Sequence, residues 1–100
     1  MKVLITDFAK QQLSDIYDYY RMQGYGKYGR SIRKEVIEKA LSLRDFPNMG
    51  ALEPNLLELN LEHRYVVVKN YKLIYRQLAD TIVVTDIFDT RRDPTEMIHI

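Results

Sequence analysis

The spacing of the apolar residues changes halfway along the chain, and this change limits the possible folds more than any other feature of the sequence. In the first half, apolar residues recur every three or four positions, as on the buried face of a helix. Two such stripes follow a short apolar run at residues 3–5. The first stripe is Ala9, Leu13, Ile16, Tyr17 and Tyr20, and the second is Ile32, Val36, Ala40 and Leu43, widened by Ile37 and Leu41.

The two stripes predict an antiparallel helical hairpin. Thr6 or Asp7 can cap the first helix, because a short side-chain oxygen accepts a hydrogen bond from an unpaired backbone N–H. Gly24 and Gly26 are expected to end that helix, since glycine adopts backbone angles that other residues avoid. The second helix is expected to begin at about residue 27 or 31, to run to about residue 45 and to stop before Pro47.

The second half of the chain has the spacing of extended strands. Leu57, Leu59 and Leu61 alternate with polar residues, which indicates a period of two. Residues 64–68, 71–78 and 82–88 are rich in Val, Ile and Tyr, and only short turns separate them. Short turns between strands predict antiparallel hairpins.

We therefore expect one α+β domain over residues 1–100. It should contain an N-terminal strand, an antiparallel helical hairpin and then an antiparallel β-meander, with the hairpin on one face of the sheet. The residues expected to be buried are Leu13, Ile16, Tyr17, Val36, Ala40, Leu43, Val67 and Ile87.

Composition excludes several classes of site. The chain has 100 residues, no cysteine, two histidines and a net charge of +1. The absence of cysteine excludes disulfides and Cys-based zinc sites, and no spacing indicates another metal or cofactor site. The chain has no apolar run near the roughly 20 residues of a membrane helix and no signal peptide, so we expect a cytoplasmic protein without membrane contact.

The basic residues are unevenly distributed along the predicted sheet. The segment from Arg64 to Arg92 contains six basic and three acidic residues, so a site for a polyanion is expected there. The same bases could equally decorate a solvated face of the sheet. No familiar catalytic motif accompanies them.

The length of one turn decides which of these bases share a face of the sheet. If the turn between the first two long strands is residues 69–71, Arg64 lies opposite Arg76 and on the same face as Lys72. If the turn is only residues 69–70, Arg64 moves to the other face. A shift of one residue reverses the direction of every side chain.

Taken together, five segments in this order and spacing resemble the RelE/ParE toxins of type II toxin–antitoxin systems. The resemblance extends over roughly residues 3–97. The segments are DIYDYY at 15–20 followed by Gly24, LRDFPNMG at 43–50, HRYVVV at 63–68, NYKLIY at 70–75 and IFDTRRDP at 87–94.

The resemblance implies a toxin that inhibits growth, that can serve plasmid stabilisation and that is neutralised by a cognate antitoxin, with which it can form a hetero-oligomer. ParE-like members poison DNA gyrase, whereas RelE-like members cut mRNA on the ribosome without a metal. The long helical hairpin, the helix ending at 15–20 and the low net charge favour the ParE-like reading. A degenerate homologue that only binds its antitoxin is a third reading.

The resemblance also assigns candidate catalytic residues for the RNase alternative. Arg64 matches a basic residue on the first central strand, and Lys72 matches an arginine on the second. Arg91 or Arg92 matches an arginine after the last strand, and His99 lies near a terminal Tyr or His that stacks on a base or donates a proton. We expect Arg64, Lys72 and one of the two later arginines to form one basic surface.

Two departures count against the RNase alternative. Ribosome-dependent members often carry a second base two residues after the first, where this chain has Val66. Lys72 stands where the family has arginine, and lysine lacks the forked donor geometry that suits phosphate.

Overall fold

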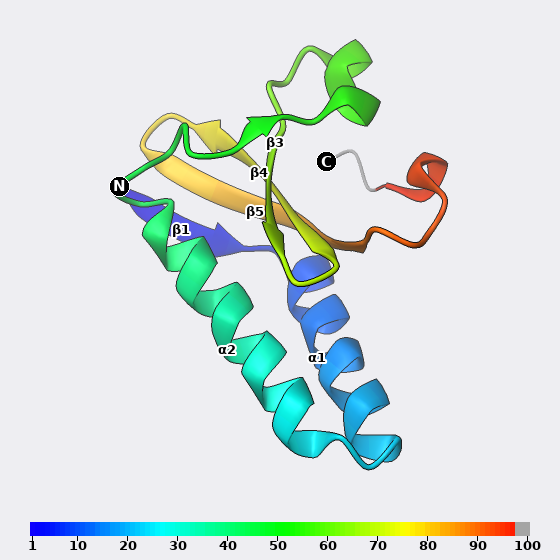
Figure 1. Cartoon of the computed structure of the whole chain (residues 1–100). Coiled ribbons are helices and arrows are strands. Elements are labelled where there is room, and N and C mark those ends of the chain that lie inside the picture. The colour runs from blue at the N-terminus through cyan, green and yellow to red at the C-terminus, as the bar shows by residue number, and fades with distance from the viewer. Residues whose placement is uncertain (98–100) are drawn as a thin grey trace.

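A mixed β-sheet with two helices on one face forms the framework of the protein (Figure 1). The computed structural model describes residues 1–97. The elements in chain order are β1 (Lys2–Ile5), α1 (Asp7–Met22), α2 (Gly26–Ser42), β2 (Ala51–Leu52), the 3-10 helix η1 (Pro54–Leu59), β3 (Arg64–Val68), β4 (Tyr71–Leu78), β5 (Thr81–Asp89) and the short 3-10 helix η2 (Pro94–Glu96). None of the helices within residues 1–97 has the length and apolar character needed to cross a membrane.

The sheet has the strand order β1-β5-β4-β3-β2. β3, β4 and β5 form the antiparallel meander predicted from the sequence. β1 lies beside β5 and runs parallel to it, so the sheet is mixed. The predicted α+β arrangement of strand, helical hairpin and meander is therefore confirmed.

Local signals in the sequence define the helical hairpin. The N–H of Ala9 donates to the Thr6 side-chain oxygen over 3.1 Å, which caps α1. Gly24 has a φ of +85° in the turn between the helices, a conformation that favours glycine. α2 ends at Ser42, earlier than predicted, and turns lead on to Pro47.

The side chain of Gln12 ties α1 to the strand beneath it. Its amide nitrogen donates to Asp86 over 2.6 Å, and its amide oxygen accepts from the Ile87 N–H over 2.7 Å. The contact lies beside a bulge, where the β4–β5 pairing shifts between Ile74 and Tyr75. β1 pairs with β5 only as far as Val84, and the Gln12 side chain bonds to β5 beyond that point.

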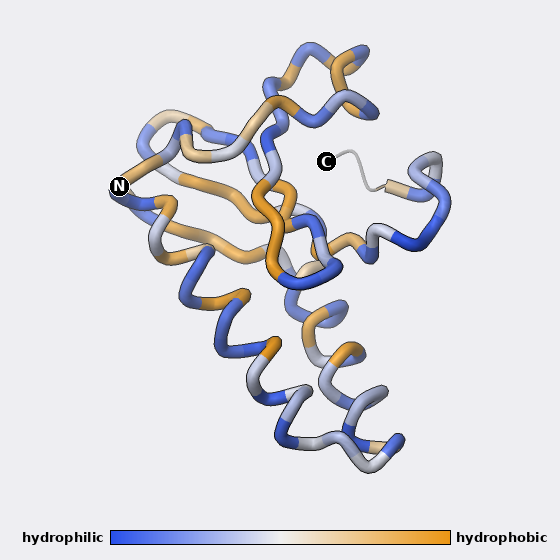
Figure 2. Tube along the Cα trace, viewed as in Figure 1, coloured by the Kyte–Doolittle hydropathy of each residue, from blue (hydrophilic) through white to orange (hydrophobic). Residues whose placement is uncertain are grey.

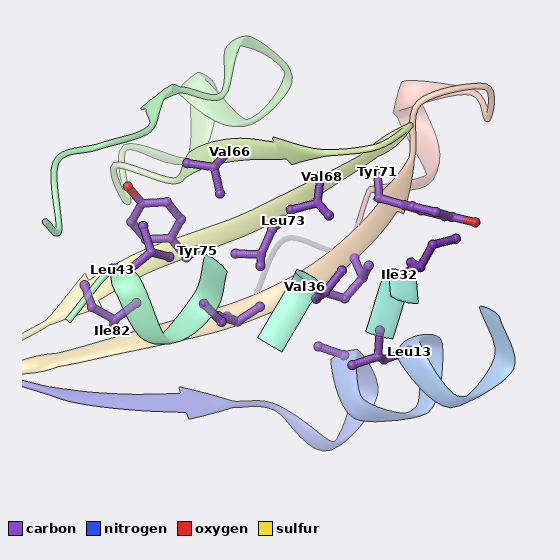
Figure 3. Close-up of a cluster of buried hydrophobic side chains, with 14 residues drawn as sticks. Leu13, Ile32, Val36, Leu43, Val66, Val68, Tyr71, Leu73, Tyr75 and Ile82 are labelled. Atoms are coloured by element: carbon purple, nitrogen blue, oxygen red, sulfur yellow. The ribbon is translucent and has the colours of Figure 1, made fainter. Parts of the chain in front are cut away.

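The main core lies between the helices and the sheet (Figure 3). Leu13, Val36, Ala40, Leu43 and Ile87 are buried there, as predicted. The helix residues converge on the strand side chains Val66, Val68, Tyr71, Leu73, Tyr75 and Ile82. Along the chain trace, the strands that form this core are the most apolar part of the molecule (Figure 2).

Three of the expected core positions differ in the structure. Ile16 and Tyr17 are only half-buried: Ile16 packs against the main core and borders a surface groove, and the Tyr17 ring lies beneath the Arg33 guanidinium. Val67 is 53% exposed, so its predicted burial was wrong. Side chains alternate along a strand, and both neighbours of Val67 already point into the main core.

The segment predicted to continue the sheet from Leu57 is instead the 3-10 helix η1. The Glu53 carboxylate accepts from the Asn55 N–H over 2.9 Å, and Pro54 presets the first helical angle. Asn60 ends the helix with a left-handed φ of +55°. The alternation of Leu57, Leu59 and Leu61 therefore reflected a solvent-exposed helix and loop, not a strand.

A smaller apolar cluster covers part of the other face of the sheet. Leu56 from η1, Ile74 from β4, Phe88 from β5 and Met97 near the chain end are all buried in it. This cluster explains why η1 and η2 lie on the side of the sheet opposite the helices (Figure 1).

Replacing Leu43 by alanine should lower the free energy of unfolding by about 2–5 kcal/mol, because Leu43 is fully buried and the substitution leaves a cavity. The matched control is Val67→Ala, which removes methyl groups from an exposed position and should change stability by about 0.5 kcal/mol or less. Urea denaturation of both variants checks the prediction. If both variants lost the same free energy of unfolding, Leu43 would lie outside the core.

Candidate functional site

The turn between β3 and β4 decides how the candidate cations are arranged. The strands pair Val68 with Tyr71 and Val67 with Lys72, so the turn is the two-residue one, Lys69–Asn70. With this register Arg64 shares a face with Val68 and points toward the helices, whereas Lys72 points to the opposite face. The expected single basic surface containing both residues is therefore not formed.

Arg64 supports the backbone of the loop before β2. It is half-buried, and its Nη1 donates to the Gly50 carbonyl oxygen over 2.7 Å. The Gly50 N–H donates in turn to the Tyr75 hydroxyl over 3.0 Å, and that hydroxyl donates to the Pro47 carbonyl over 2.8 Å. A Cβ atom at Gly50 would collide with the backbone of Tyr65. Arg64 thus belongs to a structural network around a tightly packed glycine.

Lys72 forms an ion pair with a carboxylate that is completely buried. Its Nζ lies 2.7 Å from Oε1 of Glu53, and the Lys72 side chain itself is only 20% exposed. The ammonium also lies 4.2 Å from the centroid of the Tyr65 ring, within cation–π distance. Lys72, one of the candidate catalytic cations on the sheet, is thus already neutralised within the chain.

Glu53 is the partner that the sequence did not reveal. It is 19 residues from Lys72 in the chain and lies in a segment that the sequence presents as a loop. Asn55 donates to its Oε2 from both the backbone N–H and the side-chain amide, each over 2.9 Å. Burial alone would raise the pKa of Glu53, but the hydrogen bonds from Lys72 and Asn55 together lower it.

Arg91 and Arg92 are both paired with carboxylates close in sequence. The Arg91 guanidinium makes two hydrogen bonds to Asp89, of 3.0 and 2.8 Å, and these lower the pKa of the Asp89 carboxyl to about 2. Arg92 donates to Glu96 over 2.6 Å and lies 5.3 Å from the centroid of the Phe88 ring. Because Lys72 pairs with Phe88 across the strands, Arg92 and Lys72 do approach the same face of the sheet.

The two arginines border a shallow groove of about 550 Å³ beside α1. Tyr19 and Ile16 contribute from the helix, and Tyr71 and Ile87 contribute from the strands. Burial, together with a hydrogen bond to Tyr20, raises the pKa of Tyr71, so its hydroxyl stays protonated at neutral pH. The groove contains hydrogen-bonding groups and paired charges, and its carboxylate with a lowered pKa, Asp89, is held by Arg91.

Among residues 1–97, the remaining titratable side chains do not complete a catalytic site. His99 lies outside the described residues, and His63 is 2% exposed. Lys69 lies 3.7 Å from Glu35, so four of the six bases between Arg64 and Arg92 are paired with carboxylates. Within residues 1–97 there is no group of three or more His, Cys, Asp or Glu side chains placed to hold a metal ion.

Comparison with known proteins gives a consistent result. The sequence model of the ParE toxin of type II toxin–antitoxin systems, parDE, matches residues 3–94. Among solved structures, the fold is similar to a chain of the chromosomal ParDE TA system from P. aeruginosa, with a TM-score of 0.71 and 19% sequence identity. The match covers 89% of this chain and 95% of that chain, and at this identity it shows the shared fold. A comparison with curated protein sequences gave no significant match.

The buried ion pair predicts a specific stability phenotype. Lys72→Ala leaves the Glu53 carboxylate buried without its cation, and should therefore lower the free energy of unfolding by about 3 kcal/mol at pH 7. The control is the double variant Glu53→Gln/Lys72→Met, which removes both charges and should stay close to the wild type. Chemical denaturation of the wild type, the single variant and the double variant measures the free energy of unfolding of each.

The pH dependence of stability supplies a second readout of the same pair. Because folding lowers the pKa of Glu53, the pair stabilises the fold fully above the ordinary value of 4.5 and loses this effect as the pH falls through the lower folded value. The double variant should lack this part of the acid sensitivity. A single variant as stable as the double variant would contradict the pairing.

Proposed function

The chain belongs to the ParE toxin family of type II toxin–antitoxin systems, and from this premise we propose that it acts as a ParE-like poison of DNA gyrase. The alternative within the superfamily is a RelE-like RNase that cuts mRNA on the ribosome. The two alternatives make different demands on the cations of the sheet.

The pairing of the candidate cations is the observation that favours the gyrase proposal. Metal-free RNA cleavage needs a cation directed at the phosphorane and groups that accept and donate protons. Lys72 is bound to buried Glu53, and Arg91 and Arg92 are bound to Asp89 and Glu96. A cation already bound to a carboxylate contributes little field to a developing charge on a phosphate.

The register of β3 and β4 supports the same choice. Arg64 is directed at the Gly50 carbonyl on the helix side of the sheet, so it does not join Lys72 at a shared phosphate. A poison that acts by binding to an enzyme needs no group of cations directed at one phosphate. It needs a stable fold and exposed surfaces.

We also propose that a co-encoded antitoxin neutralises the chain. The structurally similar chain comes from a ParDE TA system. On this chain, large apolar side chains remain exposed around the loop before β2 and on η1, which suits coverage by a second polypeptide. They are Phe46 at 62%, Met49 at 43%, Leu52 at 45% and Leu57 at 52%.

The gyrase proposal predicts that the purified protein inhibits DNA supercoiling by gyrase or traps cleaved DNA, while mRNA on ribosomes stays intact. The variant Glu53→Gln/Lys72→Met, which lacks the lysine without leaving a buried charge, should inhibit gyrase as the wild type does. Codon-dependent mRNA cuts by the wild type that the variant no longer makes would establish the RNase alternative instead.

The antitoxin proposal predicts growth arrest when the chain is expressed alone from a tightly controlled promoter. Co-expression of the adjacent short reading frame should restore growth, and the two polypeptides should co-purify. Normal growth of cells that contain folded protein, as judged by circular dichroism after purification, would indicate a homologue that has lost its toxicity.

A further inference from the structure

The end of the helical hairpin carries a concentrated positive charge that the near-neutral total conceals. Residues 19–34 contain five basic residues and no acidic residue. The chain as a whole has 15 basic and 14 acidic residues, so the rest of the molecule is net acidic. We refer to residues 19–34 as the hairpin tip. Its cations are Arg21, Lys27, Arg30, Arg33 and Lys34.

Most of the hairpin tip projects away from the sheet (Figure 1), and only Tyr20 and Ile32 of this segment pack against the main core. The last turns of α1, the connecting turn and the first turns of α2 extend past the strands into solvent (Figure 1). The two helices pack closely there at a glycine. Gly29 is buried, and a Cβ atom at this position would crowd Tyr17 and Tyr20.

Two of the five cations at the tip have a carboxylate partner, Arg21 with Asp18 and Lys34 with Glu38, and both pairs are exposed to solvent. Within residues 1–97, Lys27 and Arg30 form no ion pair, and both are exposed. The Arg33 guanidinium lies 4.4 Å from the centroid of the Tyr17 ring rather than against a carboxylate. Arg21 is 3.6 Å from Asp18, but both side chains are about half exposed, so solvent weakens this pair.

The N-terminus of α2 adds to the same positive field. Tyr25 is the N-cap residue and makes no capping hydrogen bond with its side chain, and no acidic residue lies in the first turn. The positive end of the helix dipole is therefore not offset within the helix. This end of α2 lies among the cations just described.

Exposed aromatic rings are interleaved with these cations. Tyr25 is 63% exposed, Tyr19 is 58% exposed and Tyr28 is 42% exposed. Tyr19 and Tyr28 each contact Tyr20 edge to face, with ring centroids 5.2 and 5.0 Å apart, whereas Tyr25 has no such ring contact among the described residues. At least one ring at the tip is thus free to stack on a ligand.

Cations that contact phosphates, together with aromatic rings on which bases stack, are the features of surfaces that bind single-stranded nucleic acid. A duplex would meet the cations but hide the faces of its bases from the rings. An acidic polypeptide would likewise leave the rings unused. The combination therefore favours an unpaired strand.

We propose that the hairpin tip binds single-stranded DNA, with Lys27 and Arg30 contacting phosphates and Tyr25 stacking on a base. The choice of DNA over RNA rests on the proposed function, because gyrase acts on DNA. The location of the surface rests on charge, exposure and ring geometry alone. The proposed contacts Tyr25, Lys27 and Arg30 do not line the groove that Arg91 and Arg92 border, although Tyr19 of the tip does.

Fluorescence anisotropy of a labelled oligothymidylate of about 15 nucleotides, titrated with the full chain, tests the proposal. The variant Lys27→Gln/Arg30→Gln should bind on the order of 10-fold or more weakly, and its slope of log affinity against log salt should be shallower by about 1.4. Tyr25→Ala should bind roughly 5- to 150-fold more weakly, whereas Tyr25→Phe, which keeps the ring, should bind as the wild type does.

A charge-matched variant controls for net charge. Lys10→Gln/Arg44→Gln removes two exposed cations from the opposite end of the hairpin and should leave binding unchanged. If this variant bound the oligothymidylate as weakly as Lys27→Gln/Arg30→Gln does, the proposed location of the binding surface would be overturned. Circular dichroism confirms that each variant is folded, which is expected because every substituted side chain is exposed.

Competing ligands test the identity of the occupant. A duplex of the same length, an oligouridylate and poly-glutamate should each bind more weakly than the oligothymidylate. If any of them binds as tightly, or if the wild type does not bind the oligothymidylate at about 50 mM salt, the proposal is overturned.

The supercoiling assay separates this inference from the proposed function. A chain that inhibits gyrase but does not bind the oligonucleotide contradicts only the inference. A chain that binds the oligonucleotide through the tip but does not inhibit gyrase contradicts the proposed target.

Discussion

The register between β3 and β4, which depends on a two-residue turn, is the constraint on which the rest of the structure depends. Lys69 takes a left-handed φ of +55° in this turn, a conformation that favours glycine, so the tight turn carries a local conformational cost. The main core offsets that cost, because this register turns Val66, Val68 and Leu73 together toward the helices. A turn one residue longer would direct one of the two strands the wrong way.

The same register places Lys72 on the face opposite the helices, where a charge needs a partner. Glu53 supplies it from the start of η1, and Asn55 holds the carboxylate in place. The pair therefore links η1 to the middle of the sheet, next to the small cluster that contains Leu56 and Phe88. Removing one partner is costly because the other charge stays buried, so this pair secures the position of η1 more than it offers a cation to a ligand.

Most of the sheet cations are paired with carboxylates, whereas Lys27 and Arg30 at the far end of the helical hairpin are exposed and form no ion pair within residues 1–97. The excess of bases between Arg64 and Arg92 predicted a polyanion site in that segment, but most of these bases are paired with carboxylates. Counting charges along a segment cannot detect pairing across the fold. The pair of Lys72 with Glu53 joins residues 19 positions apart, so only the folded chain shows that this lysine is occupied.

The sequence by itself determined the elements whose signals are local. Helical spacing predicted both helices, Thr6 and Gly24 marked the ends of α1, and runs of Val, Ile and Tyr predicted the meander. Tertiary structure decided the rest, since it depends on contacts between distant segments. The direction of β1 follows from its pairing with β5, and the exposure of Val67 follows from the turn before β4. Tertiary structure likewise decides whether a basic side chain faces solvent or a buried carboxylate. The strength of an ion pair depends on the distance between the charges and on their burial, not on their positions in the chain.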